Sequence, residues 1–285
     1  PDVDTRFSAM KSGEIMGVID LKAITPSLAT ELVKDDNFAI TTTNSTMIDF
    51  LCLNGTKAPF NDVRLRQAVS LAIDRASIVD NIYLGYASAT TNILNDSTPF
   101  YKEFEVDYDL EKAKELAAEV LGDERAAVTY LVQEGSTEQK AEAELISAAL
   151  SELGLDVSIE TYDWATIKDK MGHGDYGLAR GQQGLSNMEA ITIFKRFMDS
   201  EGDQNIAYSL GVNDADIDAL IDAADAELDM SKRQEIYDEL QEISVDVQPI
   251  VPLFNEKTLM VYNKQLIGYE AQIYGIDLPN VCWAE

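Results

Sequence analysis

The sequence has few of the residues on which catalytic and metal sites most often depend. Its 285 residues include a single histidine, His173, and two cysteines, Cys52 and Cys282. A Ser-His-Asp hydrolase, a multi-histidine zinc site or a histidine proton shuttle would each rest on His173 alone. That residue lies between Gly172 and Gly174, which is typical of an exposed turn rather than of a ligand or a catalyst. The two cysteines would be able to pair in an oxidising compartment, but two separate thiols are the expected state.

Positive charge is also scarce. Lys and Arg total 22 against 51 Asp and Glu, so the formal net charge is −29. A surface this acidic repels phosphate backbones and anionic lipid headgroups, which argues against nucleic acid as a partner. No apolar run is long enough to span a bilayer, and no Walker loop or Gly-x-Gly-x-x-Gly motif is present. Apolar residues still make up 46% of the chain, which is enough for a sizeable core, and the length suggests about two domains.

Helical and extended patterns alternate along the chain. Helices are expected at 5–12, 25–33, 60–83, 110–120, 136–153, 163–171, 188–198, 214–228 and 231–247. Strands are expected at 15–19, 38–43, 47–53, 126–132, 155–162, 176–180, 250–254 and 258–262. The regular strand–helix alternation between 109 and 180 predicts an α/β fold with a partly parallel sheet covered by helices.

One predicted strand end offers a candidate binding site. Ligands of open α/β sheets bind beyond the carboxyl ends of strands, and the strand 176–180 ends at Arg180. Arg180 would be able to pair with a ligand carboxylate or with one of the many acidic residues of the chain, and both alternatives stay open. The predicted loop that follows offers neutral hydrogen-bonding side chains, namely Gln182, Gln183, Ser186 and Asn187. Such a wall favours a polar solute or a chelate over a peptide held by its amine.

One segment is more specific than the rest of the sequence. Pro59-Phe60-Asn61-Asp62-Val63-Arg64-Leu65-Arg66-Gln67-Ala68, followed by Ala72-Ile73-Asp74-Arg75, resembles the signature of family 5 extracellular solute-binding proteins. These are the peptide and nickel receptors of ABC importers. Further matches follow in the family's order, among them Tyr108-Asp109, Asp163-Trp164, Gly174-Asp175-Tyr176 and Val251-Pro252-Leu253. The resemblance therefore covers nearly the whole chain.

The resemblance implies a type II periplasmic binding protein-like fold, in which two lobes enclose the ligand. Residues 1–43 would be a remnant of the first lobe, 44–254 the complete second lobe, and 255–285 a segment that returns to the first lobe. The hinge would lie at Asn44, Ser45, Phe254 and Asn255, and both cysteines would lie at or beside the first-lobe end. Family members carry a large N-terminal portion ahead of the residue matching Pro1, and no signal segment is visible in this sequence. We therefore expect the chain to be incomplete.

The resemblance also implies a function. The protein would bind a small polar solute, such as a peptide or a metal chelate, at the periplasmic or cell-surface side of the membrane. It would deliver that solute to ABC permease subunits without making or breaking a bond, and no cofactor is implied. Peptide-binding relatives carry a Trp and an amine-pairing Asp where this chain has Gln183 and Ser186, and the Tyr-Asp-Pro-His stretch of nickel-binding relatives is missing. The solute thus stays open.

Two other classes of function also stay open. One is a hydrolase that acts through a pair of carboxylates, although no nucleophile and base are recognisable in the sequence. The other is an acidic calcium-binding surface protein. The segment Asp214–Asp218 resembles the start of a calcium loop, but Ala219 and Asp225 stand where an EF-hand needs Gly and usually has Glu. We interpret that segment as the capped start of an amphipathic helix.

Overall fold

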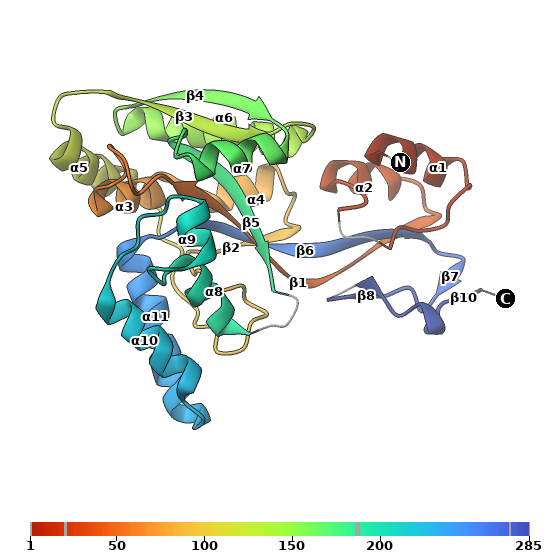
Figure 1. Ribbon diagram of the computed structural model, residues 1–285. Helices are drawn as coiled ribbons and strands as arrows, with labels where there is room; N and C mark the ends of the chain where they lie inside the picture. The colour runs from red at the N-terminus through yellow and green to blue at the C-terminus, as the bar shows by residue number, and fades with distance from the viewer. Residues whose placement is uncertain (1, 20–21, 186–188, 274, 285) are drawn as a thin grey trace.

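Two long strands connect a large body of the molecule to a small one (Figure 1). The computed structural model describes residues 2–19, 22–185, 189–273 and 275–284. The connecting strands are β1 (Phe38–Leu53) and β6 (Val251–Asn263), which pair in antiparallel orientation. Each of them was expected as two separate strands. In the structure each is continuous, because β1 and β6 pair with one another on both sides of the interruptions.

The large body is built on a six-stranded mixed sheet. Its strand order is β2-β6-β1-β5-β3-β4, with β2 at Ala87–Ala89, β3 at Ala126–Gln133, β4 at Leu155–Tyr162 and β5 at Leu178–Gly184. Strand β3 runs parallel to β4 and β5, whereas β1 runs antiparallel to β5 and β6. The prediction of an α/β fold with a partly parallel sheet is therefore confirmed.

Helices cover both faces of this sheet. They are α3 (Val63–Ala72), α4 (Arg75–Asn81), α5 (Leu110–Leu121), α6 (Thr137–Glu152), α7 (Trp164–Gly172), α8 (Ala190–Phe197), α9 (Asp203–Ala207), α10 (Ala215–Ala226) and α11 (Met230–Val247). Successive residues of a strand point to opposite faces, so Leu51 and Leu53 join the core beneath α3–α6 while Phe50 and Cys52 join the core beneath α7, α8, α10 and α11.

Acidic residues begin most of these helices. The side chains of Asp62, Asp74, Asp109, Asp163, Asp214 and Asp229 each accept a hydrogen bond from a backbone N–H of the first helical turn. Such a cap stabilises a helix by about 1 kcal/mol. Part of the acidic composition thus has a structural role, and Asp214 caps α10 as the sequence predicts.

The signature segment ties helices α3 and α4 to the start of β6. The fully buried guanidinium of Arg75 donates to the carbonyl oxygens of Ser70 and Pro252, both at 2.8 Å. Arg66 donates to the carbonyl oxygens of Val247 at 2.6 Å and Gln248 at 3.1 Å, at the C-terminal end of α11. Both arginines therefore satisfy backbone groups that would otherwise be buried without a partner.

The small body contains the two ends of the chain (Figure 1). Its elements are α1 (Val3–Lys11), α2 (Pro26–Leu32), β7 (Leu266–Ile267), β8 (Ala271–Gln272), β9 (Gly275–Ile276), the 3-10 turn Leu278–Asn280 and β10 (Cys282–Trp283). They pack with the outer halves of β1 and β6 around a third apolar core. The strand expected at 15–19 is reduced to a single bridge between Gly17 and Tyr262.

The two cysteines lie in different bodies. Cys52 is buried in the core beneath α7 and α8, whereas Cys282 is exposed in β10 of the small body. The expected placement of both at one end is therefore wrong for Cys52, because β1 carries that residue deep into the large body. Within the described residues, no helix has both the length and the apolar composition needed to cross a bilayer.

Candidate functional site

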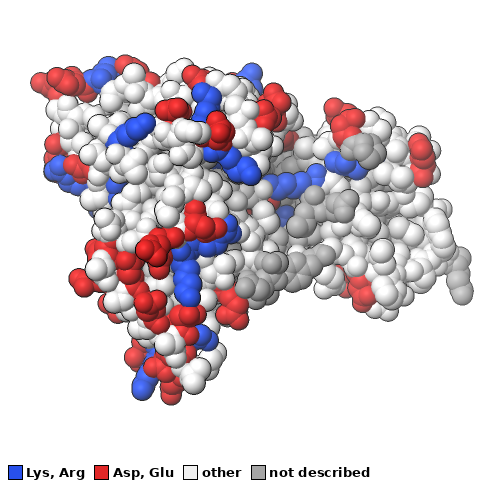
Figure 2. Space-filling model, viewed as in Figure 1, with Lys and Arg blue, Asp and Glu red and all other residues white. Residues whose placement is uncertain are grey.

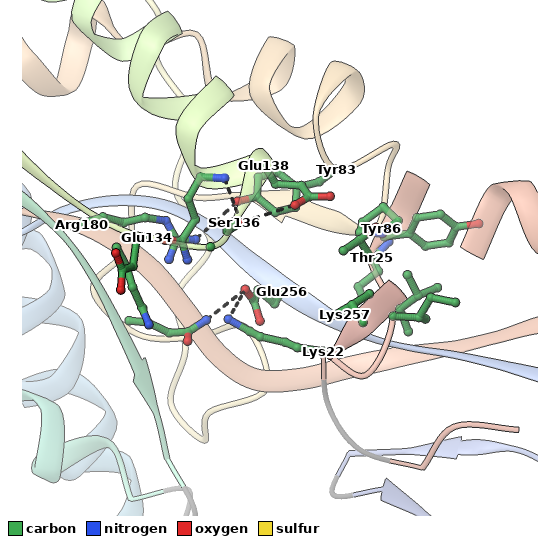
Figure 3. A pocket seen from close by; sticks show the side chains of 18 of the residues that line it. Lys22, Thr25, Tyr83, Tyr86, Glu134, Ser136, Glu138, Arg180, Glu256 and Lys257 are labelled. Atoms are coloured by element: carbon green, nitrogen blue, oxygen red, sulfur yellow. Dashed lines mark hydrogen bonds and ion pairs between the residues drawn. The ribbon is translucent and has the colours of Figure 1, made fainter. Parts of the chain in front are cut away.

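A cavity of about 600 Å³ opens between the two bodies (Figures 2 and 3). The small body contributes Val3, Lys22, Ile24, Thr25, Pro26 and Leu259 to its lining. The large body contributes Tyr83, Tyr86, Trp164, Arg180, Gly181, Gln182 and most of the segment from Gln133 to Gln139, which precedes and begins α6. Glu256 and Lys257 of β6 complete the wall. The cavity thus lies where the two connecting strands pass between the bodies.

Strand β5 brings Arg180 and Gln182 to the cavity. The strand extends to Gly184 because β1 pairs with it residue by residue, so residues 181–184 are extended rather than part of the predicted loop. Arg180 and Gln182 lie on one face of β5 and line the cavity. Gln183 points to the other face, where it accepts a hydrogen bond from Nη1 of Arg196 at 2.8 Å. The predicted contacts Ser186 and Asn187 lie outside the described residues.

A glycine lets β1 approach β5 closely at this point. A Cβ atom on Gly181 would lie 2.4 Å from the ring of Phe50, on the face of the sheet opposite to Arg180. The ring of Phe50 fills that space and contacts Phe197 edge-on, with 5.4 Å between the ring centroids. Because position 181 has no side chain, β5 can lie close to β1 at the point where it carries Arg180.

Arg180 is surrounded by carboxylates. Its guanidinium is paired with Asp49 of β1, and its Nε lies 3.0 Å from Oε1 of Glu142 on α6. The hydroxyl of Tyr83 donates to the other oxygen of Glu142 at 2.7 Å. Burial raises the pKa of Glu142, and the two carboxylates hold the pKa of Arg180 well above its usual range in spite of its burial. Of the two alternatives that the sequence left open, the internal ion pair is present.

A further carboxylate, Glu256, lies beside this group on the cavity wall. Its Oε1 is 3.0 Å from Nζ of Lys22 and accepts a hydrogen bond from Nε2 of Gln182 at 2.9 Å (Figure 3). The same Nε2 lies 3.2 Å from Oδ1 of Asp49. Burial and the nearby charge of Asp49 raise the pKa of Glu256 to about 8. Gln182 therefore bridges two carboxylates rather than presenting a free amide.

Sequence reasoning missed three acidic residues of this site, Asp49, Glu142 and Glu256. The wall is consequently not the neutral surface that the loop residues suggested. A signal was present at Asp49, which interrupts the otherwise apolar run from Met47 to Leu53. A charged residue in a strand that is buried on both faces must have a partner, so this position pointed to a buried cation.

The predicted hinge residues lie where the pairing of β1 and β6 is irregular. The register shifts between Asn44 and Ile48, so that three residues of β1 face Glu256 alone. Ser45 lies in this bulge and donates from its hydroxyl to the carbonyl oxygen of Glu256 at 2.6 Å. Asn255 and Phe254 pair with Ile48 and Asp49 just beyond it. Whether the strands bend here stays a prediction.

His173 lies apart from the cavity. It follows the last residue of α7, its side chain is 69% exposed, and its Nδ1 is 2.8 Å from the carbonyl oxygen of Asp169. The expectation of an exposed turn residue is confirmed. Among residues 2–19, 22–185, 189–273 and 275–284, no group of three or more His, Cys, Asp or Glu side chains is arranged to hold a metal ion.

The chain resembles known proteins in both sequence and structure. The profile of bacterial extracellular solute-binding proteins, family 5 Middle, matches residues 1–205. Heme-binding protein A of Haemophilus influenzae is 26% identical over 97% of this chain and 51% of its own length. A dipeptide-binding protein of Pseudomonas aeruginosa is 24% identical over 94% of this chain and 51% of its own. The chain thus spans about half the length of the curated relatives that it matches.

Solved structures share the fold over the whole chain. The substrate-binding protein CtaP of Listeria monocytogenes superimposes with a TM-score of 0.88 at 23% identity, and the chain covers 59% of it. NikA of Brucella suis, in complex with Fe(III)-EDTA, gives a TM-score of 0.87 at 20% identity and 60% coverage. DppA of Helicobacter pylori, in complex with the peptide STSA, gives 0.85 at 24% identity and 56% coverage. In each case the chain is covered completely.

Proposed function

Because this chain belongs to family 5 of the bacterial extracellular solute-binding proteins, we propose that it captures a small polar solute outside the membrane for an ABC importer. The permease subunits of that importer would receive the solute, and no bond would be made or broken. The observation that supports this function is the cavity of about 600 Å³ between the two bodies. Cavities of roughly 300–1,000 Å³ are typical of small-molecule sites.

The proposed binding step is closure of the two bodies around the solute. We assign residues 1–43 and 255–285 to the first lobe and 44–254 to the second, with the hinge at Asn44, Ser45, Phe254 and Asn255. Support comes from the two connecting strands and from the bulge between them. A solute bound to one lobe of the open state would gain contacts to the other lobe on closure, and these added contacts would stabilise the closed state.

The proposed contacts are Arg180 and Gln182, together with Ser186 and Asn187 of the segment that follows β5. Gln183 has the least support among the predicted ligand contacts, because its side chain points away from the cavity and bonds with Arg196. On the small-body side, Lys257 lines the cavity, and within the described residues no carboxylate lies within 4.0 Å of its amine. Cations and carboxylates thus share one cavity, which suits a peptide or a metal chelate that carries charges of both signs.

Binding can be followed through Trp164, which lines the cavity. The only other tryptophan, Trp283, is exposed in β10, so Trp283→Phe gives a background in which Trp164 alone reports. We would titrate the 285-residue chain carrying Trp283→Phe with dipeptides, heme and nickel–histidine chelates, and measure the affinity of any hit by calorimetry. Saturable binding that shifts Trp164 emission, and release of the solute with its mass unchanged, is the expected result. Folded protein that binds none of these solutes, or returns them cleaved, would contradict the proposal.

A further inference from the structure

The carboxylates clustered around Arg180 and Gln182 outnumber the cations that pair with them. Asp49, Glu142 and Glu256 are joined to Arg180 and Lys22 by ion pairs, and Gln182 donates to two of the three carboxylates. Three negative and two positive charges leave one uncompensated negative charge when all five groups are ionised. Asp49, Glu142 and Arg180 are buried, so water cannot screen this charge well. The network therefore requires one more positive charge.

Of these three carboxylates, only Glu256 is placed to receive that charge from a solute. Asp49 and Glu142 are fully buried behind Arg180 and do not line the cavity, whereas Glu256 does, with its side chain 15% exposed. The cation that already touches it, Nζ of Lys22, reaches it through the cavity from the small body (Figure 3). Lys22 shows the kind of contact that Glu256 can make: an alkylammonium at 3.0 Å from its Oε1.

We infer that Glu256 is a binding site for the ammonium group of a solute, and that this ammonium takes the place of a proton on the cavity wall. The inference rests on the proposed function and specifies one chemical group of its solute. Without a solute, the excess negative charge is removed by protonation. Burial, the charge of Asp49 and a hydrogen bond between the two carboxyl groups raise the pKa of Glu256 to about 8, while Lys22 and Arg180 oppose this shift.

Competition with a proton makes binding depend on pH. A solute that needs ionised Glu256 binds with an apparent affinity reduced by the fraction of ionised sites. With the pKa at about 8, this reduction makes binding about thirtyfold weaker at pH 6.5 than at pH 9. The number of protons released for each ammonium bound falls from about one at pH 6.5 to about a tenth at pH 9, because fewer of the free sites are protonated at the higher pH. A neutral solute of the same shape would show neither effect.

The test uses n-butylamine as the probe and n-butanol as its neutral counterpart. An alkylammonium such as that of lysine loses its proton only near pH 10.4, so the probe stays cationic at about pH 9 and below. Both compounds are titrated at constant ionic strength into the 285-residue chain carrying Trp283→Phe at pH 6.5 and 9, up to 100 mM, with Trp164 fluorescence as the readout. We expect n-butylamine to bind, about thirtyfold more tightly at pH 9, and n-butanol to bind without pH dependence or not at all.

Three variants separate the effect of Glu256 from that of the other charges. Glu256→Gln should lose both the preference for the amine and its pH dependence, whereas Glu144→Gln, on the exposed face of α6, should keep them. Lys22→Met removes the charge of a half-exposed side chain and should make n-butylamine bind about fivefold more tightly at pH 9, where most Glu256 is ionised; at pH 6.5 the same change also favours the competing proton. Equal binding of amine and alcohol, a pH effect below threefold, no binding of the amine, or an unchanged pH effect in Glu256→Gln would each overturn the inference. If peptides or chelates still bind in the cavity after such a result, the proposed function stands and this inference alone fails.

Discussion

Nε of Arg180 lies 3.0 Å from Oε1 of Glu142, and the two side chains are only 6% and 0% exposed. Glu142 is on α6, whereas Arg180 is on β5, so this ion pair joins a helix of the large body to the strand that lines the cavity. Buried ion pairs add little stability compared with apolar residues of the same size, but removal of one partner leaves an uncompensated charge. The pair therefore holds the strand of the cavity wall against α6, and replacement of either residue should lower the stability of the protein strongly.

Replacement of Glu142 by alanine should destabilise the protein strongly. Arg180 would keep only Asp49 as a buried counter-charge, and the hydroxyl of Tyr83 would lose its acceptor. We expect the free energy of unfolding to fall by about 3–5 kcal/mol, measured by urea denaturation at pH 7. The control is Glu144→Ala on the exposed face of the same helix, which should change it by about 0.5 kcal/mol or less. A loss below 1 kcal/mol for Glu142→Ala would show that the pair is solvated in solution.

Gly181→Ala should also destabilise the protein, for a steric reason. The new methyl group would lie 2.4 Å from the ring of Phe50, which is fully buried and cannot move away freely. Overpacking of this kind costs about 1–3 kcal/mol, measured by urea denaturation. Gly172→Ala is the matched control, because the nearest atom to its added methyl group is 3.9 Å away at the end of α7. The steric argument fails if both variants unfold at the same urea concentration.

The parts of the fold that local patterns determine were predictable. The helices α5, α6, α10 and α11 have regular apolar spacing and acidic or hydroxyl caps, and the strands β3 and β4 lie between helices with short connections. The continuity of β1 and β6 was not predictable, because polar residues such as Asn44 and Ser45 interrupt the apolar pattern. Only the partner strand, which is about two hundred residues away in the sequence, shows that the chain stays extended there.

The candidate site was predictable in its position but not in its charge. The strand end at Arg180 and the neighbouring Gln182 do line the cavity. Their partners Asp49, Glu142 and Glu256 come from three separate elements, and sequence spacing cannot show that these elements converge. With 51 acidic residues in the chain, no single one stands out as a partner. The length of β5 was missed for the same reason, since its last residues are extended through pairing with β1.

The two thiols should differ in reactivity. Cys282 is exposed, whereas Cys52 is buried and its burial raises the pKa of the thiol, so little reactive thiolate forms. In native, unreduced protein we expect Ellman's reagent to titrate one thiol quickly. After denaturation without reductant, two thiols should react. If none reacts in the denatured protein, the cysteines are paired and the placement of Cys52 in the core of the large body is wrong.

Stability should depend on pH through Glu256. Its pKa in the folded protein is raised to about 8, above the value of about 4.3 expected for an unfolded chain, so the folded state binds the proton more tightly. This contribution to stability is fully present below the unfolded value and is lost as the pH rises through about 8. Between these values the free energy of unfolding should decrease by up to about 1.4 kcal/mol for each pH unit.

Other groups titrate in the same range, so the wild type must be compared with Glu256→Gln, which mimics the protonated carboxyl at every pH. Urea denaturation at pH 5, 6, 7 and 8 gives the difference in free energy between the two proteins. We expect Glu256→Gln to gain on the wild type steadily from pH 5 to pH 8, because the wild-type carboxyl is ionised in the unfolded chain and must take up a proton on folding, whereas glutamine takes up none. His173→Gln is the control: its exposed imidazole lies outside this network, so it should not reproduce this steady gain. A difference between wild type and Glu256→Gln that is constant across this range would mean that Glu256 ionises near its ordinary pKa, with Lys22 compensating its charge.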